Sequence, residues 1–487
     1  MISFIGFALL FLLPLVESFN RSLGFTLLLS GSLFLFLPIV FRRKIRFDRI
    51  DTLFLMLLFV FAVPTVFSWS LARSFTELLR YVAYFLIFIS VRNSIGTETL
   101  LIRWYIPMIL INTVLLSLLS LLSSLPQLIV TPSEIGMNLF YPVFGHNRIA
   151  NILLFAIPLA VITSFSGTGR KRIFFFTLSL FFGGILFLSF GRGAIVSLTF
   201  AFLFSFFLFR LRNDKWDRFL SILTLFTIIF LLSSFIYSNF SGVTSQSTNI
   251  IKRFYKPVAD EKRFAFLLQG KEGFFSSPLV GTGLDTFRYV SKKYQSEPFN
   301  WSWYLHNHYL ELFVETGIMG GLLFAFFVLF SFYKGYQYIL SKLEENKIYL
   351  GVFIGLLASG IHSLLDFDWH FLSIFLFFFA GFALLLPYTF RARNIRLGFF
   401  PFLFVLILFS TPTFFPLDSD QALSQAEISF QKKDYDNAFS LLHRAYRLDN
   451  AYNEIPKKFA SFYNRLNNDS EARFWQNEAR IRSPLDP

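Results

Sequence analysis

The stretch "GRKRIFFFTLSLFFGGILFLSFGRGA", residues 169–194, decides the fold class. Between the basic cluster at its start and Arg192 near its end lie 19 consecutive uncharged residues, 173–191, most of them apolar. At 1.5 Å per residue, a helix of this length crosses a hydrocarbon core of roughly 30 Å. The stretch therefore predicts a membrane-spanning helix with basic residues on one side and a single arginine at the other end.

Similar apolar segments recur along the 487 residues, of which 55% are hydrophobic, 72 are Phe and only 15% are charged. A soluble chain carries about a quarter charged residues. We interpret residues 2–16 as part of a first span rather than as a removed signal peptide, because a basic start and a convincing cleavage site are lacking. The sequence predicts an all-α polytopic transmembrane helical bundle of about 12–13 spans. The predicted spans are 2–18, 22–41, 51–70, 76–92 (the weakest, because it contains Arg80), 99–125, 148–166, 173–190, 193–210, 219–238, 317–334, 348–366, 370–389 and 397–415.

The charges of the connecting loops predict the orientation. If the spans alternate, the loops "FRRKIRFDR", "GRKR", "RLRNDKWDR", "YKGYQYILSKLEENK" and "RARNIR" all fall on one side, which the positive-inside rule makes the cytoplasm. This bias accounts for much of the net charge of +14, and no soluble basic domain suggests nucleic acid. A large loop, 239–316, and the carboxyl-terminal tail then lie outside. Within that loop, "KRFAFLLQGKEGFF" predicts an amphipathic helix.

The tail forms a second predicted domain, 417–487, after a membrane domain of residues 1–416. Its apolar residues have helical spacing, and alanines recur after 34 residues, the period of tetratricopeptide repeats. Two such repeats are fewer than the three that stability normally requires. We therefore expect contacts with the outer loop or with a protein partner to stabilise the tail. An unrelated helical tail with chance alanines is the alternative. The recurring alanines are 426, 438 and 445, followed by 460, 472 and 479.

The segment "HNHYLELFVETGIMGG", residues 306–321, places polar groups directly before a predicted span. Polar groups at a membrane edge are expensive and usually functional. The imidazole of His306 could accept a proton from a hydroxyl. Alternatively, His306 and His308 are interfacial side chains.

Cationic residues near the outer membrane edge indicate an anionic ligand. Arg192 lies between two glycines that would clear space around its guanidinium, whose fork suits phosphate oxygens. Attraction to anionic membrane lipids is the alternative reading of the basic residues of the outer loop. "DFDW", residues 366–369, could bind a divalent cation, although hydrogen bonding within the bundle is the simpler role for Asp366 and Asp368. The chain contains neither cysteine nor a P-loop, dinucleotide-binding glycine fingerprint or HExxH motif.

Four of these segments together resemble the O-antigen ligase and polymerase superfamily. The segment 306–321 is similar to the ligase pattern of His, then Asn, nine residues and Gly-x-x-Gly, with His306, Asn307, Gly317 and Gly320 at the defined positions. "EKRFAFLLQGKEGFFSSPLVGTGLDTF" resembles the outer-loop segment of the family, "FGHNRIANILLFAIPL" its Asn-x-x-Ala span and "SFGRGA" its Ser-x-x-Arg-Gly-Ala span. The resemblance covers residues from about 50 to 390.

The resemblance implies a glycosyltransferase of the bacterial inner membrane that needs neither a metal nor another cofactor. Such ligases transfer a glycan from undecaprenyl pyrophosphate to a lipid A-core acceptor at the periplasmic face. Carried over by position, His306 is the general base, and Arg192 and Arg263 hold the pyrophosphate. Further substrate-binding residues implied are Asn147, Arg253, Arg288, Asn307, Gly317 and Gly320.

Other readings stay open at this point. His308 could be the base instead of His306. The enzyme could be an O-antigen polymerase or a protein O-oligosaccharyltransferase, and the repeats of the tail could recruit a protein acceptor. A small-anion transporter is a further alternative, but no repeat between halves and no polar residues at mid-span favour it.

Overall fold

The computed structural model describes residues 2–42, 44–94, 97–130, 146–189, 191–210, 261–342, 347–388, 392–396, 398–414 and 419–485. These form two compact units. The bundle unit comprises Met1–Asp48, Ala83–Val258 and Val328–Gly398, and the loop unit comprises Arg49–Val82, Ala259–Phe327 and Phe399–Pro487. Helices α4 (Leu71–Arg92) and α15 (His308–Lys342) contribute to both.

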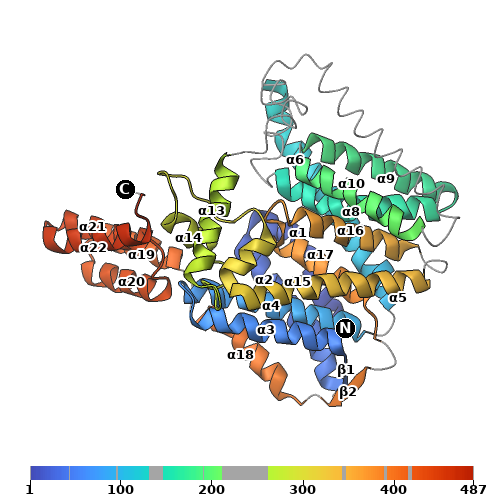
Figure 1. The fold of residues 1–487 in the computed structure, drawn as a ribbon, viewed down its shortest axis with the longest axis horizontal. Helices are drawn as coiled ribbons and strands as arrows, with labels where there is room; N and C mark the ends of the chain where they lie inside the picture. The colour runs from blue at the N-terminus through green and yellow to red at the C-terminus, as the bar shows by residue number, and fades with distance from the viewer. Residues whose placement is uncertain are drawn as a thin grey trace. The chain divides into compact units, whose positions relative to one another are not determined.

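The bundle unit is built from long apolar helices (Figure 1). Helix α17 is buried along its whole length, which explains why its sequence is apolar on every side. The backbone N–H groups of Leu372 and Ser373, at its start, donate to the Glu17 carboxylate over 2.7 and 2.9 Å. Glu17 also pairs with Arg148 at 2.9 Å, so a buried acid caps one helix and binds another. The helices are α1 (Ile2–Phe19), α2 (Arg21–Arg42), α5 (Thr97–Leu100), the π-helical turn Leu101–Tyr105, α6 (Ile106–Val130), α8 (His146–Ser166), α9 (Gly169–Leu188), α10 (Arg192–Arg210), α16 (Ile348–His362), the 3-10 turn Asp368–His370 and α17 (Leu372–Leu385).

Two of the basic loops pair with each other in the bundle unit. Strand β1 (Lys44–Phe47) and β2 (Arg393–Arg396) are antiparallel, with Lys44 opposite Arg396 and Phe47 opposite Arg393. The loops that the sequence assigns to the same side of the membrane therefore lie together.

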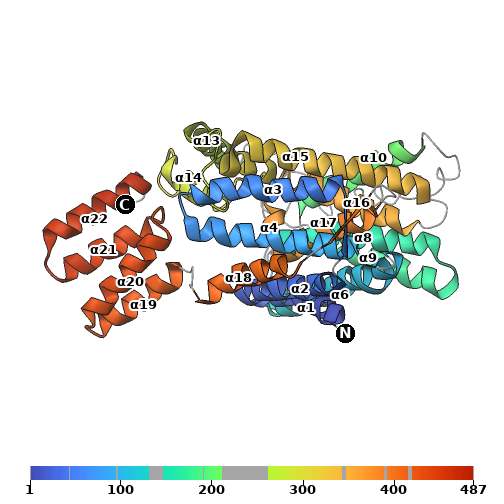
Figure 2. The same cartoon turned by 90° about the horizontal axis from the view of Figure 1, so that it is seen from below.

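The loop unit combines the outer loop, the tail and all or part of four helices of the predicted membrane domain. Helix α3 (Arg49–Val66) lies beside the first half of α4, with the Phe61 and Tyr81 rings 4.9 Å apart (Figures 1 and 2). The other elements are α13 (Glu261–Ser276), α14 (Phe287–Lys293), the first part of α15, α18 (Phe400–Phe414) and the tail helices α19 (Ser419–Gln431), α20 (Tyr435–Leu448), α21 (Glu454–Arg465) and α22 (Asp469–Arg482).

The tail packs as two helix pairs, α19 with α20 and α21 with α22 (Figure 2). All six recurring alanines are buried, as close helix packing requires. The assignment to tetratricopeptide repeats itself stays a prediction. The expected support from the outer loop is present: Lys292 Nζ on α14 lies 2.9 Å from Asn453 Oδ1, and Gln295 Nε2 lies 3.2 Å from Ser483 Oγ.

The all-α, multi-pass architecture is confirmed. Among the described residues, eight helices are long and apolar enough to span a membrane, and four shorter apolar helices accompany them. The segment predicted as weakest forms α4, in which Arg80 is buried and pairs with Glu77 one turn earlier. Predicted spans 348–366 and 370–389 are too long, because residues 363–371 form turns between α16 and α17. The predicted span 219–238 lies outside the described residues.

Candidate active site

His306 lies directly before α15 in an unusual backbone conformation. Its φ of 59° is in the left-handed region, which residues other than glycine rarely adopt. The backbone on either side is fixed, because Leu305 N donates to Glu311 Oε2 over 2.7 Å and Leu310 N donates to Asn307 Oδ1 over 3.0 Å. Asn307 thus caps α15, which gives this motif residue a structural role. The turn holds the half-buried imidazole of His306 in one place.

The His306 ring stacks on Phe266 of α13. The ring centroids are 6.0 Å apart and the planes differ by 16°. Arg263 lies three residues before Phe266 on the same helix, and residues at this spacing are neighbours on a helix surface. The structure therefore brings the predicted base together with the segment that carries one predicted pyrophosphate ligand. The Arg263 side chain itself is exposed.

His308 has a different environment. Its side chain is buried, its Nε2 lies 3.5 Å from the Tyr81 hydroxyl and its ring packs edge-on against Phe324. This burial favours His306 over His308 as the residue that an acceptor could reach.

The backbone segments that contain the glycines of two motifs are hydrogen-bonded to each other. Ile318 N donates to Pro278 O over 2.9 Å, and Gly283 N donates to Glu315 O over 2.9 Å. At Gly317 a Cβ would lie 2.3 Å from Leu279 O, and at Gly281 a Cβ would lie 2.3 Å from Glu315 O. Gly317 has φ 67° and kinks α15 at this point. The structure thus gives Gly317 a reason in backbone packing, and its predicted role in substrate binding stays a prediction.

Gly320 is also explained by packing. A Cβ there would lie 2.1 Å from Thr316 Oγ1 and 3.4 Å from the Phe61 ring. The Thr316 side chain, one turn earlier on α15, therefore occupies the space that a side chain at this motif position would need. Its predicted role in substrate binding likewise stays a prediction.

Glu315 organises the start of α14 from within these hydrogen-bonded segments. Its Oε1 accepts hydrogen bonds from Thr286 N at 2.8 Å and from Phe287 N at 3.1 Å, and the side chain is buried. Glu315, nine positions after His306, thus fixes the loop after the Gly-x-Gly segment.

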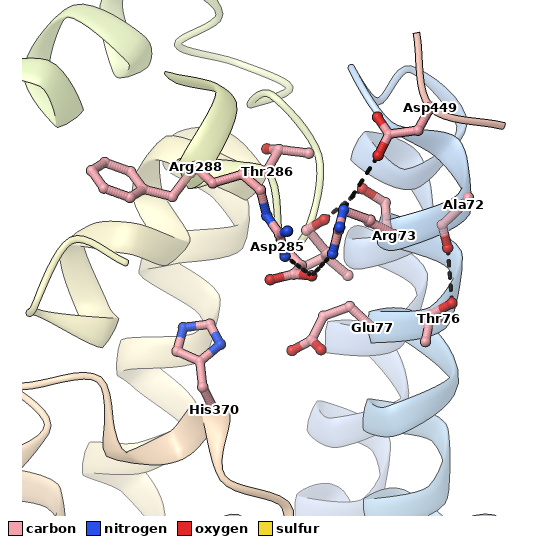
Figure 3. Close-up of polar contacts among 12 residues, drawn as sticks. Ala72, Arg73, Thr76, Glu77, Asp285, Thr286, Arg288, His370 and Asp449 are labelled. Carbon is pink, nitrogen blue, oxygen red and sulfur yellow. Dashed lines mark hydrogen bonds and ion pairs between the residues drawn. The ribbon is translucent and has the colours of Figure 1, made fainter. Parts of the chain in front are cut away.

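An ionic cluster connects α4, the outer loop and the tail (Figure 3). Arg73 Nε lies 2.6 Å from the Tyr289 hydroxyl and 3.3 Å from Asp449 Oδ2, while its Nη1 lies 3.7 Å from Asp285 Oδ2. Arg288 Nη2 lies 3.5 Å from the same Asp285 oxygen. Burial raises the pKa of the Asp449 carboxyl above its ordinary value, and the nearby Arg73 guanidinium opposes that shift.

The structure places Arg288 between this cluster and an aromatic ring. Its guanidinium lies 4.2 Å from the centroid of the Trp303 ring, and the side chain is largely buried. Arg288 therefore positions the loop in this structure, and direct contact with substrate stays a prediction.

Sequence reasoning named Arg288 but missed Arg73, Asp285 and Asp449. Arg73, Glu77 and Arg80 occur at spacings of four and three, which places them on one face of a helix. That charged stripe inside an apolar segment was the available signal. Asp449 gave no such signal, because its partners are distant in sequence.

In the bundle unit, two further motifs pack against each other. Arg192 is the first residue of α10 and is exposed. A Cβ at Gly191 would lie 2.7 Å from the Ala150 Cβ of the Asn-x-x-Ala segment, and one at Gly193 would lie 2.7 Å from His362 Nε2. Close packing therefore accounts for both glycines, and their predicted role in clearing space for a ligand stays a prediction. Asn147 begins α8, but its side chain is not described.

The acidic pair of "DFDW" takes part in hydrogen bonds within the bundle. Asp368 accepts from Asn151 Nδ2 at 2.5 Å and pairs with His362 Nδ1, and Asp366 Oδ1 accepts from Phe367 N at 2.9 Å. The ligand atoms of His362, Asp366 and Asp368 lie within 4.8 Å of one another, yet each carboxylate has a hydrogen-bonded role in this arrangement. The hydrogen-bonding interpretation accounts for these residues.

The region that contains His306, Arg263 and Arg192 matches a known family. Residues 174–325 match the family model described as O-antigen ligase. Over this segment the chain is similar to the O-antigen ligase family. A search among curated proteins finds no match to the chain.

The Asn-x-x-Ala segment, residues 144–159, precedes the matched residues, and the match supports the resemblance for the other three motifs. The matched segment includes the proposed base, both proposed pyrophosphate arginines and the glycines of the His motif. Together with the apolar helices it supports a multi-pass membrane protein that is similar to a glycosyltransferase-type enzyme family. Arg253 belongs to the matched segment but lies outside the described residues.

Proposed function

We propose that this protein transfers a glycan from undecaprenyl pyrophosphate to a hydroxyl of a lipid A-core acceptor, at the periplasmic face of the bacterial inner membrane. The acceptor oxygen attacks the anomeric carbon, a new C–O bond forms and the bond to pyrophosphate breaks with inversion. His306 accepts the hydroxyl proton, and undecaprenyl pyrophosphate leaves with the bonding electron pair.

The observation that carries the proposal is the fixed position of His306. A strained φ, a capped helix start and the stacked Phe266 ring together hold an imidazole in reach of solvent. Such strain persists only where the surroundings enforce it, and it clusters at active sites. Imidazole is a suitable general base near neutral pH.

The charge of the leaving group gives the two arginines their proposed role. Charge develops on pyrophosphate as the bond breaks, and fixed guanidinium groups stabilise it without a metal. Arg263 lies about one turn before Phe266, the residue on which His306 stacks. Arg192 begins α10, where the helix N-terminus also favours an anion. We assign both residues to pyrophosphate binding.

A transfer assay in proteoliposomes tests the proposal. The vesicles contain undecaprenyl-pyrophosphate-linked glycan and lipid A-core acceptor, with EDTA throughout. We expect His306→Ala, Arg192→Ala and Arg263→Ala each to lower the transfer rate roughly a hundredfold or more. Arg172→Ala, which removes an exposed arginine of the predicted cytoplasmic loop, is the matched control and should transfer at the wild-type rate.

The products separate this function from its alternatives. A longer lipid-linked glycan without labelled acceptor would indicate a polymerase, and transfer to an added protein would indicate a protein O-oligosaccharyltransferase. If folded wild-type protein transfers to none of these acceptors, the proposal is wrong.

A further inference from the structure

Helix α13 has apolar residues on two opposite faces. One face packs inward: Phe266 is buried in a cluster with Phe287, Val290, Leu305 and Val314. The opposite face exposes four large apolar side chains at helical spacing. These are Phe264 (62% exposed), Leu267 (40%), Leu268 (47%) and Phe275 (64%).

The outward face does not fit a helix in water. A helix at an aqueous surface normally turns charged and polar residues outward, and contiguous exposed apolar patches mark interaction sites. The helix predicted for this segment is present as α13, and its outward face is largely apolar. Its exposed charges, Lys262, Arg263, Lys271 and Glu272, are predominantly basic.

The apolar face continues onto a membrane span. Leu279, just beyond α13, is exposed, and the hydrogen bond between Ile318 N and Pro278 O ties this segment to α15. At that point α15, a candidate span, exposes Ile318 and Met319. Both ribbon views show α13 beside the first part of α15 (Figures 1 and 2).

We propose that the outward face of α13 is a membrane-interface helix, lying in the boundary between lipid head groups and acyl chains. Apolar residues with flanking Lys and Arg are the composition of such helices, which attract anionic lipid. The occupant of this face is the bilayer, because exposed apolar residues continue from Phe275 through Leu279 to Ile318 and Met319 of the candidate span. Lys271, on the same face, can extend its charge toward the lipid head groups. This inference does not depend on the reaction. If the proposed function also holds, the helix keeps Arg263 at the depth of lipid phosphates.

Site-directed fluorescence tests this placement, and the absence of cysteine makes every introduced cysteine a unique label. Leu268→Cys and Phe275→Cys are each labelled with an environment-sensitive dye and reconstituted into phosphatidylethanolamine–phosphatidylglycerol vesicles. Met319→Cys is the control within a candidate span. Ile481→Cys, an exposed apolar residue of the tail helix α22, is the matched control for a label in water.

We expect lipids with a nitroxide near the head group to quench the labels at 268 and 275. Aqueous iodide should quench these two labels severalfold less than it quenches the 481 label. Iodide quenching equal to that of the 481 label would overturn the proposal. Protection from both quenchers would also overturn it, because another part of the protein would then cover the face. Two positions are used so that one poorly folded variant does not decide the result, and transfer activity is not required for the measurement.

Discussion

His306 and His308 are two residues apart, yet their surroundings differ. His306 is half-buried on a strained turn, whereas His308 is buried beside Tyr81 and Phe324. A general base contributes about a hundredfold to ten-thousandfold in rate. We expect His306→Gln to lower kcat by about this factor without changing the melting temperature.

His308→Gln is the matched control for this prediction. Because its ring fills a buried site, we expect the substitution to lower the melting temperature while the remaining folded enzyme keeps most of its kcat. Transfer kinetics and thermal unfolding of both variants check this. The opposite pattern would identify His308 as the base.

At the scale of elements, the kink of α15 depends on a single glycine. In Gly317→Ala, a methyl group would meet Leu279 O at 2.3 Å in a backbone of φ 67°. Strain of this kind costs about 1–3 kcal/mol, and the clash adds to it. We expect a clearly lower melting temperature and a large loss of transfer, because the Pro278–Gly283 segment would move away from α15.

Gly335, on the same helix, provides the comparison. A Cβ there would meet its nearest neighbour at 3.7 Å, an ordinary contact. Alanine is favoured over glycine in a helix by roughly 1 kcal/mol. Gly335→Ala should therefore leave the protein as stable as the wild type or more so. Equal destabilisation by both substitutions would show that the backbone angle at 317 is not the cause.

An ion pair links α19 to α21 in the tail. Hydrogen bonds from Lys458 Nζ at 3.0 Å and Arg465 Nη1 at 3.1 Å hold the pKa of the Glu427 carboxyl below its ordinary value. A carboxyl with a lowered pKa stabilises the folded tail above its unfolded pKa, and this contribution is lost as the pH falls through the folded value. At neutral pH the partly exposed network contributes about 0.2–1 kcal/mol.

Hydrogen exchange of α19 and α21 measures this effect. We expect Glu427→Gln to lower the opening free energy of these helices at pH 7, and the difference from wild type to shrink as the pH falls toward about 4. Adding Lys458→Gln to this variant should cost less than Lys458→Gln does in the wild type. A pH-independent difference would mean that the charge of Glu427 is not responsible.

At the scale of the whole molecule, the sequence predicted most of what regular patterns encode. Apolar length predicted the helices, and the 34-residue spacing predicted which tail alanines are buried. The motifs predicted the candidate site residues, but not that Gly317 contacts Leu279 or that Asp449 binds Arg73. Such contacts join residues far apart in sequence, and no local periodicity reports them. Gly191 and Gly193 illustrate the same limit, since their neighbours Ala150 and His362 became apparent only in the fold.

The orientation in the membrane is the last prediction, and it concerns every span at once. Basic loops remain in the cytoplasm because moving them across the membrane is unfavourable, so residue 171 should be cytoplasmic and residue 470 of the tail periplasmic. Single cysteines at these exposed positions, Lys171→Cys and Ser470→Cys, report on the two sides. In cells with a permeabilised outer membrane, a membrane-impermeant maleimide should label 470 at once and 171 only after lysis. The reverse result would place His306 and the tail in the cytoplasm, where the proposed periplasmic transfer could not occur. Labelling of both residues or of neither before lysis would show that the number of spans between them is even rather than odd.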